Sequence, residues 1–204
     1  MTLTSDMLKG YIANRDVKGI LGLMFEQRTP SLSLGFNRED QLWDFKQDCP
    51  SVSRGSSEAE WAKISADVLA FHNQDGGIIF FGIRDSDYSF VGATERLDTK
   101  LFNDKIRKYC GDKFWVSFAR EYITPDQRYL GIAIIPPKSF AHQRLLKDAP
   151  PEQGKYYFKA GDLCFRIGDE TRILRGSEAI EYAATKGWVC LRRLTPLKNL
   201  TFVF

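Results

Sequence analysis

Four acidic residues and one lysine lie close to the ends of two segments that the sequence pattern predicts to be strands. Glu39 and Asp40 come just before the first segment, and Asp44 and Lys46 lie within it. Because side chains two positions apart on a strand point to the same face, Asp44 and Lys46 share a face. Asp85 follows the end of the second segment. Carboxylates at strand ends and in adjacent loops commonly bind hard divalent cations.

This set of residues fits the chemistry of phosphodiester hydrolysis. Glu39, Asp44 and Asp85 would hold Mg²⁺ or Mn²⁺, which stabilises charge on phosphoryl oxygens and lowers the pKa of its water. Lys46 would neutralise the phosphate as the pentacovalent state forms. The alternative is that these acids are solvated surface groups, because carboxylates near strand ends are common. The predicted catalytic residues are thus the three acids, which are also the predicted metal ligands, and Lys46.

The segments that must position these residues can be predicted from periodicity. Residues 41–47 alternate between polar and apolar, which indicates a strand, and residues 78–83 form a nearly continuous apolar run, which indicates a central buried strand. Between them, Ser57 and Glu60 predict a capping box, and apolar residues at helical spacing predict a helix to about Asn73 with one buried face. His72 is expected to be a hydrogen-bonded residue near the end of this helix.

The remaining elements alternate irregularly. Helices are predicted at 4–14, from Asp16 onward, at 98–109 capped by Asp98, and at 177–187. Strands are predicted at 114–123 and 129–135 around a turn at Pro125, and at 156–158 and 163–167 around Gly161. This order predicts an α+β fold with a mixed, mostly antiparallel sheet and packed helices. We expect a helical arm over residues 1–37, the main domain over 38–185, and a basic strand or tail over 186–204.

Charge is distributed unevenly along the chain. Residues 1–137 contain 17 Lys and Arg against 19 Asp and Glu, whereas residues 138–204 contain 12 against 7. Residues 186–204 carry four basic residues, including Arg192 and Arg193, and no acid. A basic C-terminal third suits a polyanionic partner, and ordinary scatter of surface charge is the alternative.

Aromatic and basic residues also interleave near Lys159 and Arg166, a pattern that can stack bases and hold phosphates. Arg166 is expected to be exposed. The predicted nucleic-acid contacts are Arg84, Lys159, Arg166, Arg192 and Arg193.

Several other classes of protein are excluded or disfavoured. No stretch approaches about 18 consecutive apolar residues, and the first twenty residues show no secretory pattern, so we expect a cytoplasmic protein with no membrane partner. The four cysteines are widely separated, which predicts reduced, mostly buried thiols and no zinc pair. A phosphate-binding loop at 73–77 is disfavoured because the glycines follow a helix and lack the required spacing, so a nucleotide-binding protein is the weakest hypothesis.

A series of short motifs resembles one known family. The motifs are E-x4-D-F-K from Glu39, A-F-H-N-Q-D-G-G from Ala70, G-I-R-D from Gly82 and R-I-G from Arg166. Over about residues 38–185, this series resembles the Schlafen-type AlbA domain, whose motifs are usually written E-x4-E-F-K, A-F-x-N-x-x-G-G, G-V-x-D and R-x-G. Each motif alone is weak evidence. A chance match of all of them in the family's order and spacing is improbable.

The resemblance implies a function. In the nuclease branch of the family, three carboxylates form the site for divalent-metal cleavage of structured RNA, notably tRNA-like molecules. By position these are Glu39, Asp44 and Asp85, with Lys46 beside them. Asp44 stands where the family mostly has glutamate, so a metal would have to sit closer to that strand. The resemblance therefore implies a metal-dependent endoribonuclease that uses Mg²⁺ or Mn²⁺.

The resemblance also implies partners and an alternative. RNA is favoured over DNA, although the residues themselves do not separate the two. Because related vertebrate nucleases clamp RNA between two lobes in one chain, a single lobe implies a homodimer or a partner with a second Schlafen-like lobe. Many bacterial members lack the acids, so the alternative function is a non-catalytic nucleic-acid-binding or regulatory module.

Overall fold

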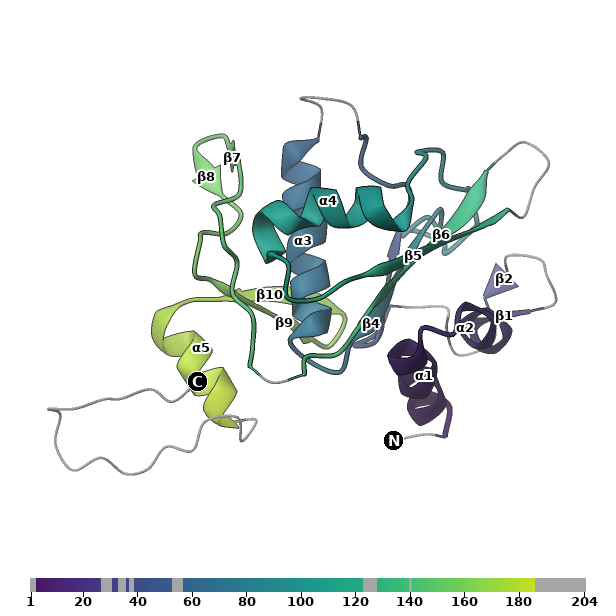
Figure 1. Ribbon diagram of the computed structural model, residues 1–204, viewed down its shortest axis with the longest axis horizontal. Coiled ribbons are helices and arrows are strands. Elements are labelled where there is room, and N and C mark those ends of the chain that lie inside the picture. The colour runs from purple at the N-terminus through teal and green to yellow at the C-terminus, as the bar shows by residue number, and fades with distance from the viewer. Residues whose placement is uncertain are drawn as a thin grey trace, which may run out of the picture.

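A four-stranded mixed sheet lies at the centre of the protein (Figure 1). The structure is a computed structural model that describes residues 3–26, 31–32, 36, 39–52, 57–122, 128–139 and 141–185. The strand order is β3 (Trp43–Lys46), β4 (Gly77–Phe81), β6 (Tyr129–Ile135) and β5 (Ser117–Tyr122). Only the β3–β4 pair is parallel among the described pairs of this sheet. The predicted α+β fold with a mostly antiparallel mixed sheet is confirmed.

One face of the sheet is covered by α3 (Glu58–His72) and α4 (Thr99–Cys110), as Figure 1 shows. The parallel β3–β4 pair requires a crossover connection, and α3 supplies it. Ile79 and Phe81 of β4 belong to the same hydrophobic core as the apolar residues of both helices. The predicted cap of α4 is confirmed, because the Asp98 carboxylate accepts a hydrogen bond from the Leu101 N–H at 2.7 Å.

The predicted capping box at the start of α3 is wrong. Ser57 adopts a left-handed conformation with φ 110°, and its side chain makes no capping hydrogen bond. Its hydroxyl instead donates to the Ser51 carbonyl at 2.8 Å. The competing bond to the preceding loop therefore takes the side chain away from the helix end.

The opposite face of the sheet is covered by α1 (Leu3–Asn14) and α2 (Val17–Met24) (Figure 1). Their buried residues share a second hydrophobic core with Phe45, Ile78 and Phe80. Asp16 caps α2 as predicted, since its carboxylate accepts the Gly19 N–H at 2.9 Å. The segment predicted as a helical arm thus packs directly on the sheet.

A β-hairpin of β9 (Leu163–Ile167) and β10 (Glu170–Leu174) packs against α3 and is followed by α5 (Gly176–Thr185). The strands predicted at 156–158 and 163–167 do not pair with each other. β8 (Lys155–Tyr156) pairs with β7 (Pro151–Glu152), because positive φ angles at Gln153 and Gly154 make a tight turn between them. A further two-stranded pair joins β1 (Phe25–Glu26) and β2 (Ser31–Leu32).

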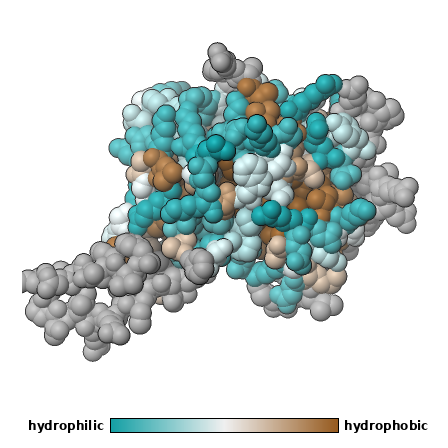
Figure 2. All heavy atoms as spheres, viewed as in Figure 1, coloured by the Kyte–Doolittle hydropathy of each residue, from teal (hydrophilic) through white to brown (hydrophobic). Residues whose placement is uncertain are grey.

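The face drawn in Figure 2 is mostly hydrophilic, with hydrophobic residues in separate areas. Among the described residues, no helix is both long and apolar enough to cross a membrane. Cys49, Cys110 and Cys164 are buried free thiols, as expected, whereas Cys190 lies outside the described residues. The predicted turn at Pro125 and the basic segment 186–204 also lie outside them.

Candidate active site

The free edge of β3 positions Glu39. β3 is the edge strand of the sheet as far as the structure describes the chain, so within that part the backbone groups on its outer side have no partner strand. A turn in which the Asp40 N–H donates to the Trp43 carbonyl at 3.3 Å folds the chain back along this edge. The Glu39 carboxyl then accepts a hydrogen bond from the Phe45 N–H at 3.1 Å. The six-residue separation therefore brings Glu39 beside the middle of β3.

Asp44 and Lys46 point from β3 to the same side, as the alternation predicts. The Lys46 ammonium lies 2.7 Å from Asp44 Oδ2, and the Asp44 side chain is only 2% exposed. The same ammonium lies 3.5 Å from Oδ2 of Asp67, which α3 supplies. Lys46 is therefore held between two carboxylates from two different elements.

Arg166 on β9 is the second cation of this cluster, and the prediction that it is exposed is wrong. Its side chain is 2% exposed, stacks over the Phe71 ring and lies 4.0 Å from Asp44. Its guanidinium also donates to the carbonyls of Asp40 at 3.1 Å and Trp43 at 3.4 Å. The guanidinium satisfies the outer edge of β3, so it is not available as a surface contact for nucleic acid.

The cluster perturbs the pKa values of its acids. Burial, and then the hydrogen bond and negative charge of Asp44, raise the pKa of Glu39 to about 8. Burial alone would raise the pKa of Asp44, but the hydrogen bond from Glu39 and the charges of Lys46 and Arg166 outweigh it and lower that pKa. Glu39 is therefore mainly a carboxylic acid at neutral pH and donates its proton to the Asp44 carboxylate.

Asp67 and Lys46 complete the electrostatics of the cluster. Burial first, and then the charge of Asp44, raise the pKa of Asp67 despite the opposing effect of Lys46. Burial would lower the pKa of Lys46, but the charges of Asp67 and Asp44 raise it, so the ammonium keeps its proton. Lys46 and Arg166 thus lie among these carboxyl groups, and their two positive charges reduce the repulsion that an approaching phosphate would meet.

Asp85 lies at the mouth of this cluster. The Gly82 N–H donates to the Lys46 carbonyl at 2.8 Å, and this bond keeps the turn after β4 next to the end of β3. Burial and the charge of Asp44 raise the pKa of Asp85, and Lys46 opposes this effect. Its exposed side chain forms no hydrogen bond or ion pair within the described part of the chain. Glu39 and Asp44 are therefore in direct contact, whereas Asp85 interacts with Asp44 and Lys46 only through its charge.

The remaining predicted nucleic-acid contacts lie at different places. Arg84 is exposed beside Asp85 and pairs with Asp87 at 3.0 Å. Lys159 is exposed and lies over the Tyr156 ring, 5.5 Å from its centroid. Arg192 and Arg193 lie outside the described residues.

Three residues that interact with the cluster were not identified by the sequence analysis, namely Asp67, Thr171 and Tyr157. Asp67, besides contacting Lys46, accepts a hydrogen bond from the Thr171 hydroxyl of β10. Tyr157 is 39% exposed, and burial and then the negative charge of Asp67 raise the pKa of its hydroxyl to about 12. A polar residue in the buried face of a predicted helix was the available signal for Asp67.

The A-F-x-N-x-x-G-G segment contacts the cluster through Phe71, which lies against Arg166, and supports it through Asn73. The Asn73 amide donates to the carbonyls of Gln143 and Cys164 at 2.9 and 3.1 Å, and its oxygen accepts the Gln143 N–H at 2.7 Å. Gly76 has φ 78° and ends the helix, as predicted. These bonds join α3 to β9, the strand that carries Arg166. His72 is hydrogen-bonded at the helix end as expected, with its Nδ1 2.8 Å from the Pro136 carbonyl.

Among the acids of the cluster, the carboxyl groups of Glu39 and Asp44 have the oxygen chemistry that a hard divalent ion requires. Glu39 and Asp44 share a proton between their carboxyl groups. Carboxylate oxygens are ligands that Mg²⁺ and Mn²⁺ favour. Within the described ranges, however, no group of three His, Cys, Asp or Glu side chains is arranged to hold a metal ion. The Glu39–Asp44 pair supplies oxygen ligands of the kind that a hard divalent ion takes, and a metal held by this pair with Asp85 as a third ligand remains a prediction.

The fold and the site together define an α+β domain with a buried acidic and basic cluster at one sheet edge. The family described as Schlafen, AlbA_2 matches residues 39–174, and the chain belongs to this family. Membership indicates a function related to nucleic acids. No curated protein matches the chain.

The fold is also found among solved structures. The crystal structure of the DIP2311 protein from Corynebacterium diphtheriae matches with a TM-score of 0.52 at 15% sequence identity. The match covers 86% of this chain and 32% of that one. At this identity the similarity concerns the fold alone.

Proposed function

We propose that the protein is a divalent-metal-dependent endoribonuclease that cleaves structured, tRNA-like RNA. The observation that carries the proposal is the proton-sharing Glu39–Asp44 pair beside Lys46, in a chain of the Schlafen AlbA_2 family. Mg²⁺ or Mn²⁺ held by this pair would stabilise charge on the phosphoryl oxygens and supply an activated water.

The chain's own residues would prepare the site for a phosphate. Lys46 is partly exposed, with 30% of its side chain accessible, so its ammonium can neutralise a bound phosphate. Asp67 and Asp44 fix the position of this ammonium, and Arg166 fixes Asp44. Tyr157 is exposed, and its hydroxyl interacts electrostatically with Asp67.

The direct test is incubation of the protein with tRNA, single-stranded RNA and duplex DNA. We expect cleavage of tRNA with Mg²⁺ or Mn²⁺, and none with a chelator. Binding of RNA without cleavage under every metal condition would instead support a non-catalytic nucleic-acid-binding module. The pairing of Asp44 with Lys46 and Arg166 favours this second function, because the carboxylate is already neutralised without a metal.

Metal binding is expected to release a proton near neutral pH. Because Glu39 has a raised pKa of about 8, its bound proton stabilises the fold fully below about pH 4.5, and this contribution is lost as the pH rises through about 8. A metal bound by both carboxylates must displace this proton. Calorimetry with Mn²⁺ at pH 7, in buffers of different ionisation enthalpy, should show release of about one proton by the wild type and none by Glu39→Gln. Equal release by both proteins would contradict this assignment.

Asp85→Asn is expected to lower cleavage and preserve RNA binding. The amide keeps the shape of the side chain but is a much weaker ligand for a hard cation. Because Asp85 has no described hydrogen bond or ion pair, stability should change by no more than about 0.5 kcal/mol. Cleavage rates and RNA affinity should be compared with those of Asp87→Asn, which changes an exposed acid two residues away. Equal rates for Asp85→Asn and the wild type would remove Asp85 from the site.

We further propose that two copies of this lobe, or this lobe and a similar one, enclose a folded RNA. Most soluble homo-oligomers are closed and two-fold symmetric. With RNA bound, light scattering should give the mass of the RNA plus twice the 23.3 kDa chain mass. A single-chain mass, both free and with RNA, would contradict the homodimer.

A further inference from the structure

A pocket of about 410 Å³ lies at the end of the sheet where β4 begins and β6 ends. Lys46 pairs with Phe81 at the other end of β4, so the pocket shares no lining residue with the carboxylate cluster. Its volume is in the range of sites that hold small ligands, about 300–1,000 Å³. The lining includes no acidic residue.

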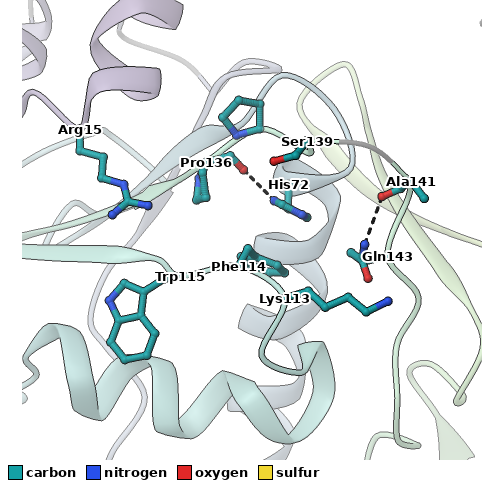
Figure 3. Close-up of a pocket in the computed structure, with 10 residues that line it drawn as sticks. Arg15, His72, Lys113, Phe114, Trp115, Pro136, Ser139, Ala141 and Gln143 are labelled. Atoms are coloured by element: carbon teal, nitrogen blue, oxygen red, sulfur yellow. Dashed lines mark hydrogen bonds between the residues drawn. The ribbon is translucent and has the colours of Figure 1, made fainter.

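Three of the residues that line this pocket carry aromatic rings, namely His72, Phe114 and Trp115 (Figure 3). The rings of His72 and Phe114 are stacked, with centroids 3.8 Å apart and an interplanar angle of 14°. His72 is fixed by its bond to the Pro136 carbonyl, and burial lowers its pKa, so the ring is neutral at neutral pH. Trp115 is 40% exposed and offers an accessible indole face.

Two cations accompany these rings. Figure 3 shows Arg15 and Lys113 on opposite sides of the His72–Phe114 pair. Both side chains are exposed, and neither forms an ion pair in the part of the chain that the structure describes. The nearest acids in sequence are occupied elsewhere, since Asp16 caps α2 and Asp112 pairs with Arg107 at 2.7 Å.

We propose that this pocket binds one unpaired nucleotide of a nucleic-acid strand. The base would stack on Trp115, and Arg15 and Lys113 would contact the phosphates on its two sides. An internal nucleotide has one phosphate on the 5′ side of its sugar and one on the 3′ side. This arrangement suits two cations on either side of the aromatic rings that line the pocket. The proposal rests on the proposed nucleic-acid function and places a contact at the sheet end opposite Asp85.

The test measures binding of a trinucleotide, a nucleoside monophosphate and a nucleoside to the Glu39→Gln protein in chelator, so that no cleavage is needed. We expect Arg15→Asn with Lys113→Ala to lower the slope of log affinity against log salt for the trinucleotide by about 1.4, at about 0.7 for each phosphate contact on a single strand. Asparagine is chosen because Arg15 has φ 55°, which asparagine tolerates. Trp115→Ala should weaken binding about fivefold or more without changing the slope.

Matched controls are Lys100→Ala and Tyr122→Ala, which alter an exposed lysine and a 58% exposed aromatic ring outside the pocket lining. Unchanged affinity and slope in the pocket variants, or effects equal to those of the controls, would overturn the proposal. Tighter pocket-dependent binding of the monophosphate than of the trinucleotide would assign the pocket to a free nucleotide and overturn the strand contact. Equal binding of nucleoside and trinucleotide would overturn phosphate recognition. A wild type that fails to cleave RNA refutes the nuclease function and leaves these binding results intact.

Discussion

Glu39→Gln is expected to lower metal-dependent RNA cleavage by about a hundredfold or more while leaving the fold intact. At neutral pH Glu39 is protonated, and glutamine has nearly the same shape as this neutral acid. Its amide oxygen can accept the Phe45 N–H, and its NH₂ can donate to Asp44. The variant cannot become a carboxylate, however, so it loses one ligand for the metal.

The measurements are the cleavage rate at saturating Mn²⁺ and the urea midpoint of unfolding. Glu121→Gln, which changes an exposed acid on β5, is the matched control and should cleave like the wild type. Cleavage at the wild-type rate by Glu39→Gln would remove the proton-sharing pair from the mechanism. RNA binding by a wild-type protein that does not cleave would support the alternative function.

Arg166→Ala is expected to reduce the free energy of unfolding by about 3 kcal/mol. Loss of one partner of a buried ion pair typically costs about 3–5 kcal/mol, because the remaining charge stays buried. Lys46 still neutralises Asp44 at 2.7 Å, which places the expected cost at the lower end. The variant also loses the guanidinium bonds to the Asp40 and Trp43 carbonyls.

Urea unfolding should be compared with that of Arg172→Ala on the neighbouring strand. Arg172 has a 57% exposed side chain, so its replacement should change stability by no more than about 0.5 kcal/mol. Arg166→Lys should lie between the wild type and Arg166→Ala, because lysine restores the charge without the planar fork. If Arg166→Ala instead lost RNA affinity without losing stability, Arg166 would be a direct contact for nucleic acid, as the sequence analysis predicted.

The two variants separate two roles within one cluster. Glu39 lies beside β3 and hydrogen-bonds Asp44, and its proton is the one that a bound metal ion would displace. Arg166 reaches Asp44 from the interior and joins the β9–β10 hairpin to the edge strand. Cleavage is therefore expected to depend on Glu39 and stability on Arg166, two different partners of the same carboxylate.

The local parts of this arrangement follow from the sequence. Alternation on a strand places Asp44 and Lys46 on one face, and their ion pair confirms it. The apolar run at 78–83 predicts the central strand, because a strand buried on both faces carries no alternation. The helix caps of Asp16 and Asp98 involve partners three residues away, so they too are visible in the sequence.

Only the tertiary structure shows that Arg166 helps to neutralise Asp44 and that Asp67 is a further acid of the cluster. Asp67 follows Lys46 by a loop and half a helix, and Arg166 lies on a strand more than a hundred residues later. No local periodicity predicts that α3 and β9 converge on the free edge of β3, because this contact depends on how the crossover helix and the hairpin pack. Arg166 was expected at the surface since arginine is rarely buried without a partner, and only the folded chain supplies its partners.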